Sequence, residues 1–126
     1  MFLGMSFKIT WKDSNVIISF TKNLSYKDMY DVNNLVYGDS RFNNMKYQIA
    51  DFSKIEKFEF TKEEITIIST LEKSSTIWNN KIKLAIITSD VDYLRAIKPY
   101  LEVMKTTNWE LKVFKTIDVG EKWCVE

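Results

Sequence analysis

The sequence of 126 residues contains no histidine. Imidazole is the side chain that most often serves as a general base near neutral pH, and it is the usual ligand of zinc and iron. Its absence argues against Ser-His and Cys-His catalytic dyads and against most metal sites. We therefore expect no metal and no cofactor, and we expect the protein not to be an enzyme unless carboxylates alone carry the chemistry.

Cysteine, proline and glycine are scarce as well. The single cysteine, Cys124, has no partner for an intrachain disulfide, which favours a reducing compartment, so we expect a cytoplasmic protein. The three glycines are well separated, so the sequence has no glycine-rich loop to cradle a phosphate. Residues 1–5 are apolar but too short for a signal peptide, and no later run reaches the length of a membrane span. We therefore expect no membrane partner.

The charges nearly cancel, with 18 Lys and Arg against 17 Asp and Glu. A net charge of +1 creates no broad field that would attract nucleic acid, so we expect no nucleic-acid partner. With 45% hydrophobic residues the chain can bury a sizeable core, and we expect one domain over residues 1–126.

The first twenty residues show the period of two that is typical of strands with one buried and one wet face. Apolar side chains alternate with polar ones in two runs: Met5, Phe7, Ile9 and Trp11, then Val16, Ile18 and Phe20. Residues 13–15, Asp-Ser-Asn, favour a turn between the runs, which predicts a hairpin. The first strand would lie at an exposed sheet edge and is the best candidate for pairing with a second copy in a homodimer.

A helix is predicted to follow the hairpin. Ser25, with Asp28 three residues later, is typical of a helix N-terminus, and apolar residues at helical spacing continue to Tyr37. Gly38 then predicts a left-handed C-cap, and residues 39–44 predict a loop.

The segment from Lys46 to Asn80 is the centre of the predicted fold: a strand over residues 47–51, a loop over residues 52–60 and a helix that opens at Thr61. Thr61 and Glu64 match a capping box, and Phe60 and Ile65 are spaced as a hydrophobic staple. The stripe predicted to face the sheet is Ile65, Ile68, Leu71 and Trp78. We expect this unit to lie in the middle of the sheet.

Two further pairs of strand and helix complete the chain. Residues 82–87 are nearly continuously apolar and rich in β-branched side chains, which is typical of a parallel strand covered on both faces. Ser89, with Asp92, predicts the next helix start, and Pro99 should kink or split that helix. A strand over residues 111–114 and a short helix over residues 117–123 follow. The predicted fold class is therefore α/β, with a mixed sheet of about five strands in the order β-β-α-β-α-β-α-β-α.

Several short motifs accompany this order of elements. They are Ile49-Ala50-Asp51-Phe52-Ser53, Phe58-Glu59-Phe60-Thr61, Ala85-Ile86-Ile87, Val113-Phe114-Lys115 and the late Trp123. Together they resemble the SpoIIAA-like (STAS) fold of anti-sigma-factor antagonists, and more narrowly a set of small uncharacterised bacterial proteins of that fold. The resemblance covers about residues 5 to 124.

The resemblance implies a non-enzymatic regulatory or protein-interaction module in signalling, with a protein partner of the kinase or anti-sigma type. In the antagonists, a phosphorylated serine lies where a loop meets the second helix. Matching Asp51-Phe52-Ser53 to the family's Asp-Leu-Ser places Glu59 at its acidic position and Thr61 at the phosphorylated one. Phe60 and Lys62 depart from the family's serine and glycine. Thr61 is thus a candidate phosphoacceptor, and the alternative is a plain helix cap.

Polar residues follow the predicted parallel strands. Asp51, Ser53, Thr88, Ser89 and Asp90 should meet at the carboxyl edge of the sheet, where open α/β sheets bind ligands. With Phe58 and Glu59 of the neighbouring loop they form our candidate surface for a ligand or a partner. The alternative is that these residues only cap helices and close turns. Likewise Asp51, Glu56 and Glu59 could act as paired catalytic carboxylates, or could be solvated loop charges.

Aromatic residues make up 14% of the chain and include Trp11, Trp78, Trp109 and Trp123. They could line an apolar cavity for a small lipid-like ligand or stack nucleic-acid bases, but most fall on the buried phase of an element, which favours core packing. Three functions therefore stay open: an interaction module, a carrier of a small apolar ligand between helices and sheet, and an enzyme that uses carboxylates.

Overall fold

The computed structural model describes residues 6–126, so the predicted strand position Met5 lies outside the described residues. The elements, in chain order, are β1 (Phe7–Lys12), β2 (Asn15–Ser25), α1 (Tyr26–Tyr37), the short 3-10 helix η1 (Ser40–Asn44), β3 (Tyr47–Glu59), α2 (Lys62–Ser75), β4 (Lys83–Ile87), α3 (Val91–Ala96), α4 (Lys98–Met104), β5 (Glu110–Phe114) and α5 (Ile117–Val125). The predicted α/β class and the mixed five-stranded sheet are confirmed.

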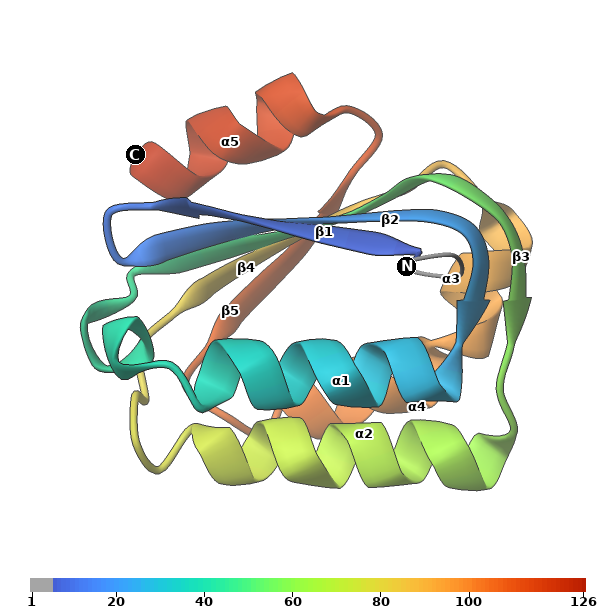
Figure 1. Ribbon diagram of the computed structural model, residues 1–126, viewed down its shortest axis with the longest axis horizontal. Coiled ribbons are helices and arrows are strands. Elements are labelled where there is room, and N and C mark those ends of the chain that lie inside the picture. Colours follow the sequence, from blue (N-terminus) through green and yellow to red (C-terminus); the bar gives the residue numbers. More distant parts are fainter. Residues whose placement is uncertain (1–5) are drawn as a thin grey trace, which may run out of the picture.

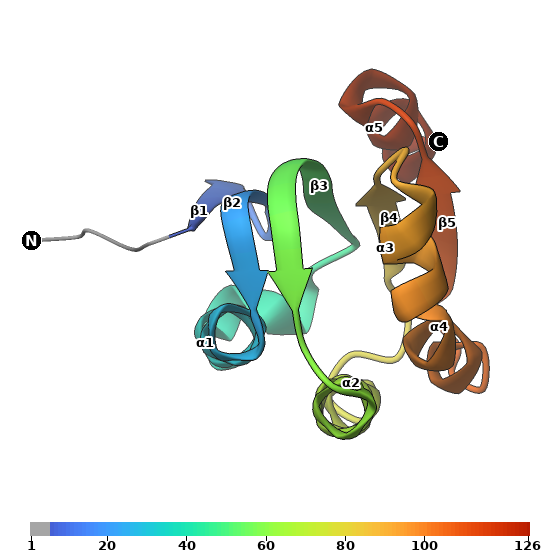
Figure 2. The ribbon, with the colours of Figure 1, turned by 90° about the vertical axis from the view of Figure 1, so that its right-hand side faces the viewer.

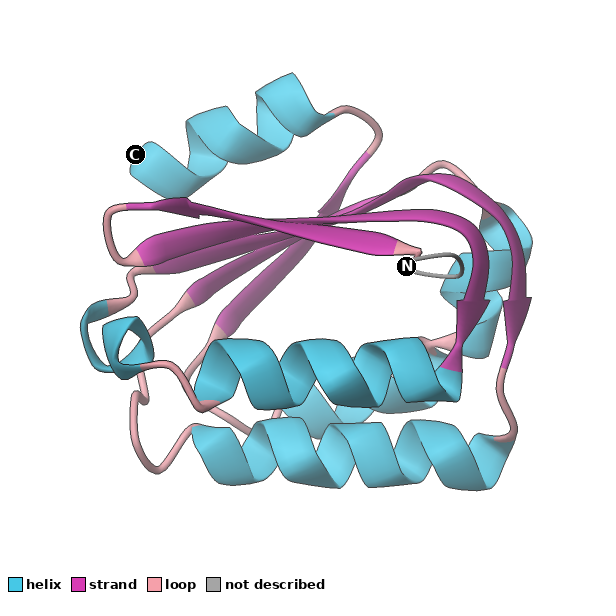
Figure 3. Cartoon of the chain, in the orientation of Figure 1, coloured by secondary structure: helices cyan, strands magenta, loops and turns pink. Residues whose placement is uncertain are grey.

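The sheet has the strand order β1-β2-β3-β4-β5, so β3 lies in its centre as predicted. β1 pairs with β2 in antiparallel fashion, and all the other neighbours are parallel. Helices α1, α2 and α4 lie on one side of the sheet and α5 lies on the other (Figures 1 and 3). The interior strand β4 is therefore covered on both faces, which explains its continuously apolar sequence.

The hairpin between β1 and β2 closes where the turn residues predicted it. Lys12 pairs with Asn15, and Asp13 adopts a positive φ of 55°, a conformation that a short acidic side chain tolerates. The Asn15 side chain then accepts hydrogen bonds from the amides of Lys46 and Tyr47, at 2.8 and 3.0 Å. The turn thus also fixes the start of β3 beside β2.

The predicted loop over residues 52–60 is wrong, because β3 continues as a strand to Glu59. Its second half, which we call the β3 extension (residues 53–59), pairs in parallel with the second half of β2, where Ser25 lies opposite Glu59. Register shifts after Ser19 and Lys22, together with the positive φ of Lys22, bend the two strands. Both strands curve out of the main sheet toward α1 and α2 (Figure 2). Alternation in this segment is weak, so the strand depends on tertiary pairing.

The start of α1 matches the prediction, whereas its end does not. Ser25 and Asp28 form a complete capping box. Gly38, predicted to be left-handed, has a right-handed conformation with a φ of −84°. The chain continues from it almost directly into η1, so the predicted loop over residues 39–44 contains a helical turn capped by Asp39.

Helix α2 begins as predicted but buries a different face. Thr61 and Glu64 form the capping box. The helix ends at Ser75, so Trp78 lies beyond it and is 76% exposed, and Leu71 is also exposed. The predicted stripe is wrong in these two positions. The buried residues of α2 are Ile65, Ile68, Ser69 and Glu72.

Pro99 divides the third predicted helix into α3 and α4, as expected for a residue without a backbone donor. The predicted cap at Ser89 is wrong. Asp90 caps α3, because its carboxylate accepts hydrogen bonds from the amides of Asp92 and Tyr93, at 2.9 and 3.1 Å. A carboxylate at this position also interacts favourably with the helix dipole.

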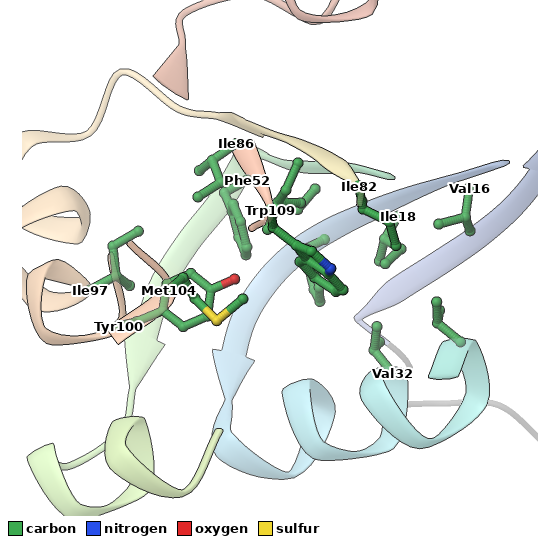
Figure 4. Close-up of a cluster of buried hydrophobic side chains, with 14 of the residues drawn as sticks. Val16, Ile18, Val32, Phe52, Ile82, Ile86, Ile97, Tyr100, Met104 and Trp109 are labelled. Atoms are coloured by element: carbon green, nitrogen blue, oxygen red, sulfur yellow. The ribbon is translucent and has the colours of Figure 1, made fainter. Parts of the chain in front are cut away.

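The hydrophobic core has two parts, one on each face of the sheet. The larger part lies between the sheet and helices α1, α3 and α4, where Val32 of α1 points toward the strands (Figure 4). The smaller part lies under α5 and contains Ile49, Ala85 and Ile87. Across residues 6–126, no helix is both long enough and apolar enough to cross a membrane.

Candidate functional site

The carboxyl edge of the parallel strands carries the polar residues of the predicted ligand surface. Asp51 on β3 lies opposite Ile87, the last residue of β4, so Thr88 follows directly at the same edge. Asp51 and Thr88 are buried, whereas Ser53, Ser89 and Asp90 are exposed.

Hydrogen bonds within the chain use several of these polar groups. The Asp51 carboxylate accepts a bond of 2.9 Å from the amide of Ser53, and the Thr88 hydroxyl accepts one of 3.0 Å from the amide of Asp90. Both are local turn bonds. In residues 6–126, no group of three or more acidic or cysteine side chains is placed to hold a metal ion. The side chains of Asp51 and Thr88 at this edge therefore serve the turns.

Next to this edge, three aromatic rings anchor the β3 extension. Phe58 and Phe60 stack with ring centroids 5.5 Å apart, and Phe58 also meets the edge of Tyr93 on α3 at 5.3 Å. Tyr93 is buried, whereas Phe58 and Phe60 are half-buried. Such contacts hold the end of the extension in one position relative to α3.

Thr61, the candidate phosphoacceptor, follows the extension and is exposed. Its hydroxyl accepts a hydrogen bond of 3.1 Å from the amide of Glu64, while the Glu64 carboxylate accepts one of 2.8 Å from the amide of Thr61. A phosphate on this hydroxyl would face free helix amides, but it would also approach the carboxylate of Glu64. These two hydrogen bonds are those of a helix cap.

The β3 extension is paired on one side only. β4 pairs with β3 from Tyr47 to Asp51 and ends at Ile87, whereas β2 stays paired with β3 as far as Glu59. In the described part of the chain, the other edge of residues 53–59 therefore has no strand beside it. An edge of this kind offers backbone donors and acceptors to an incoming extended segment.

Sequence reasoning missed a second group of polar residues, which lies inside the larger core. Glu72 on α2 is only 4% exposed, and its carboxylate accepts a hydrogen bond from the hydroxyl of Tyr100 on α4. Tyr37 on α1 donates a hydrogen bond of 3.3 Å to the side chain of Gln48 on β3. We call these four residues, together with Asn33 of α1, the buried polar cluster.

Burial changes the protonation of this cluster. Loss of solvent raises the pKa of Glu72 from 4.5 to about 7, although the hydrogen bond from Tyr100 opposes the shift. Burial, followed by the nearby Glu72 charge, also raises the pKa of Tyr37 and of Tyr100 well above 10. The carboxyl is therefore the only member of the cluster that titrates near neutral pH.

Asn33 is the one unsatisfied member. It is 8% exposed, and its Nδ2 has no hydrogen-bond partner among the described residues. Asn33, Gln48, Glu72 and Tyr100 all line one cavity beneath the sheet. Buried polar atoms are nearly always paired, so this amide needs a physical explanation.

A signal for this cluster is present in the sequence. The buried residues of α2 are spaced i, i+3, i+4 and i+7, which is the pattern of one helix face. In α1, Met29, Val32, Asn33 and Val36 have the same spacing and lie against the core. The spacing predicts that positions 33 and 72 are buried. A polar residue at such a position, however, is normally interpreted as an interruption of the apolar stripe.

Among the solved structures that resemble this chain, two match it over 94% of its length. One is an uncharacterised protein from Shewanella loihica, of the DUF3478 family and with a SpoIIAA-like fold; it has 12% sequence identity and a TM-score of 0.55 over 94% of this chain and 91% of that one. The other is the anti-sigma factor antagonist SpoIIAA in its unphosphorylated form, with 8% identity and a TM-score of 0.60 over 94% of this chain and 96% of that one. The chain has a SpoIIAA-like fold. No protein-family model and no curated protein matches the sequence.

The SpoIIAA-like fold explains why the predicted and the missed residues lie apart. The fold places the end of β3 and the start of α2 at the open end of the sheet, where Ser53, Glu59 and Thr61 are exposed. It places the middle of α1 and α2 over the sheet, where Asn33 and Glu72 are buried. The first region is therefore exposed at the surface, and the second is enclosed in the core.

The side chains of this SpoIIAA-like chain that could act as nucleophiles or bases lie in different environments. Cys124 is buried under α5, and loss of solvent raises the pKa of its thiol from 9.0 to about 11. The thiolate, which is the reactive form, is thus disfavoured at neutral pH. Glu56 and Glu59 are exposed, whereas Asp51 is buried, so the predicted carboxylate set has no common environment.

Proposed function

We propose that the protein is a non-enzymatic regulatory module that binds a protein partner through the β3 extension and the start of α2. The one-sided pairing of residues 53–59 carries this proposal, because it leaves one edge of the extension beside no other strand. A partner segment that lies along this edge would gain main-chain hydrogen bonds without unfolding any part of the module.

The rigidity of the extension supports binding. Phe58 and Phe60 pack against Tyr93, so the edge is already held in place before a partner arrives. Preorganisation lowers the entropy lost on association. The exposed side chains of Lys54, Lys57 and Glu59 would then select the partner by charge.

The kind of partner follows from the fold comparison. SpoIIAA is described as an anti-sigma factor antagonist and was solved in its unphosphorylated form. By analogy of fold alone, we propose a partner of the anti-sigma or kinase type, in a cytoplasmic signalling pathway. Thr61 is then the candidate phosphoacceptor, and in vitro labelling with a cognate kinase, with Thr61→Ala as the control, decides between phosphorylation and capping.

The contact is testable by site-specific crosslinking. A photo-crosslinking amino acid at position 57 should capture one dominant protein in the producing cells, whereas the same group at Lys105, exposed at the end of α4, should not. The captured protein is then purified and titrated against the wild type, Lys54→Glu/Lys57→Glu and the matched control Lys105→Glu. We expect the double variant to lose roughly tenfold or more in affinity, and the control to stay at the wild-type value.

Equal capture from positions 57 and 105, or equal affinity of all three proteins, would contradict the proposed surface. A homodimer through the free edge of β1 stays a separate prediction. Light scattering of the purified protein tests it, and a monomer at all concentrations would remove it.

A further inference from the structure

The cavity beneath the sheet has both an apolar body and a polar end. It measures about 40 Å³ and lies between the strands β2, β3 and β4 and helices that include α1, α2 and α4. Most of its wall is apolar, with Ile18, Phe52, Ile65 and Ile86 among the lining residues. The polar part of the wall consists of Asn33, Gln48, Glu72 and Tyr100. Its lining includes no lysine and no arginine.

The unpaired amide of Asn33 shows which group is missing from this cavity. Its Nδ2 is a buried donor with no acceptor among the described residues. Leaving a buried donor unsatisfied costs the full desolvation penalty of that group. An oxygen acceptor inside the cavity would remove this cost, and a second hydrogen-bonding group, Glu72, lines the same space.

The size and charge of the cavity define the class of ligand. A cavity must offer on the order of 10–15 Å³ to hold a single water. This cavity of about 40 Å³ therefore holds a few waters or a molecule of a few non-hydrogen atoms. An anionic head would find no cation in the lining. The raised pKa of Glu72 keeps its carboxyl largely uncharged below about pH 7, so a cationic head would find no fixed anion there either.

We propose that this cavity is a binding site for a small neutral organic molecule with an apolar body of a few carbon atoms and one carbonyl or hydroxyl oxygen, which accepts a hydrogen bond from Asn33 Nδ2. The apolar part lies against Ile65 and Ile86, and the oxygen lies toward the buried polar cluster. The site is separate from the β3 extension and does not depend on the proposed partner surface.

The test uses a pair of probes of equal size, 2-butanone and n-butylamine. The protein is labelled with ¹³C at isoleucine methyl groups and titrated at pH 6 with either probe. We expect 2-butanone to shift the methyl signals of Ile18, Ile65 and Ile86 and to show nuclear Overhauser contacts with them. Butylamine carries the same chain on a cation and should shift them at least several-fold less at equal concentration.

Two variants then test the polar end of the cavity and its apolar lining separately. Asn33→Leu removes the donor and should weaken 2-butanone binding roughly three- to tenfold, the worth of one hydrogen bond. Ala50→Val adds volume to the lining and should weaken both probes equally. Ala96→Val is the matched control, because Ala96 on α3 is half-buried and outside the cavity lining; it should bind as the wild type does.

Three results would overturn the proposal. In the wild type, absence of methyl shifts with tens of millimolar 2-butanone would mean that the cavity holds only water. Preference for butylamine would contradict the proposal that the ligand is neutral. Unchanged affinity for 2-butanone in a folded Asn33→Leu variant would contradict the role of Asn33. If Asn33→Leu does not fold, the contacts between 2-butanone and the wild-type methyl groups, together with Ala50→Val, decide the matter.

Discussion

At the scale of single residues, caps were the most predictable features of this chain. Ser25 and Thr61 both form the capping boxes that their spacing to Asp28 and Glu64 predicted. A cap depends on residues within one turn, so the sequence contains the whole interaction. The cap of α3 was assigned one residue too early, to Ser89 instead of Asp90, because adjacent polar residues compete for the same role.

The Thr61 cap gives the first prediction. Thr61→Ala should lower the free energy of unfolding by about 1 kcal/mol, since it leaves the amide of Glu64 without its acceptor. The control is Thr66→Ala, an exposed threonine within the same helix, where alanine should be neutral or slightly stabilising. Urea denaturation followed by circular dichroism measures both. Equal losses in the two variants would mean that the cap contributes nothing specific.

At the scale of elements, tertiary pairing decided what local pattern could not. The β3 extension was predicted as a loop because Ser53, Lys54, Glu56 and Lys57 offer no apolar alternation. It is a strand because β2 runs beside it and supplies the hydrogen bonds. Helix α5 is the opposite case, because it begins at Ile117 as predicted, and its contact with the sheet depends on one glycine of its own sequence.

That glycine, Gly120, sets how closely α5 approaches the sheet. A Cβ at this position would meet the Ile87 Cδ1 atom at 2.6 Å and the Phe114 ring at 3.3 Å. Gly120→Val should therefore lower the free energy of unfolding by about 2 kcal/mol, as overpacking of a closed interface does. Its neighbour Val119 is 55% exposed, so Val119→Ala should change stability by less than about 0.5 kcal/mol.

Thermal and urea denaturation of the two α5 variants provide the measurement. A Gly120→Val variant as stable as the wild type would show that α5 can move away from β4 without loss. The smaller core under α5, which includes Cys124, would then contribute little to the fold.

At the scale of the whole molecule, the buried polar cluster joins α1, β3, α2 and α4. Tyr37, Tyr93 and Tyr100 surround or face Glu72, and the pKa of each tyrosine is raised well above 10. Only Glu72 changes its charge between pH 5 and 8 in this part of the core. The stability of the entire fold should therefore depend on pH through this one carboxyl.

The direction follows from the raised pKa. The folded protein holds a proton on Glu72 up to about pH 7, whereas the unfolded chain releases it near the ordinary value of 4.5. Stability from this group is thus fully present below about pH 4.5 and is lost as the pH rises through 7. The loss should amount to roughly 3 kcal/mol between these limits.

Urea denaturation at pH 5, 6, 7 and 8, followed by the fluorescence of the buried Trp109, tests this dependence. Glu72→Gln keeps the shape of the side chain and removes its charge, so the free energy of unfolding should fall less as the pH rises. Glu63→Gln, exposed in the first turn of the same helix, should leave the decline unchanged. If the free energy of unfolding changed equally with pH in the wild type and in Glu72→Gln, Glu72 would be charged in the folded protein at neutral pH.

The sequence alone determined the order of elements, the central place of β3, the N-terminal caps of α1 and α2, and the split at Pro99. These depend on interactions within a few residues or on the apolar character of a strand that is covered on both faces. Only the tertiary structure decided that residues 53–59 form a strand, that Trp78 lies beyond α2 and is exposed, and that Asn33 and Glu72 line the same cavity. A polar residue on a buried helix face is explained by its neighbours in space, and those neighbours come from distant parts of the chain.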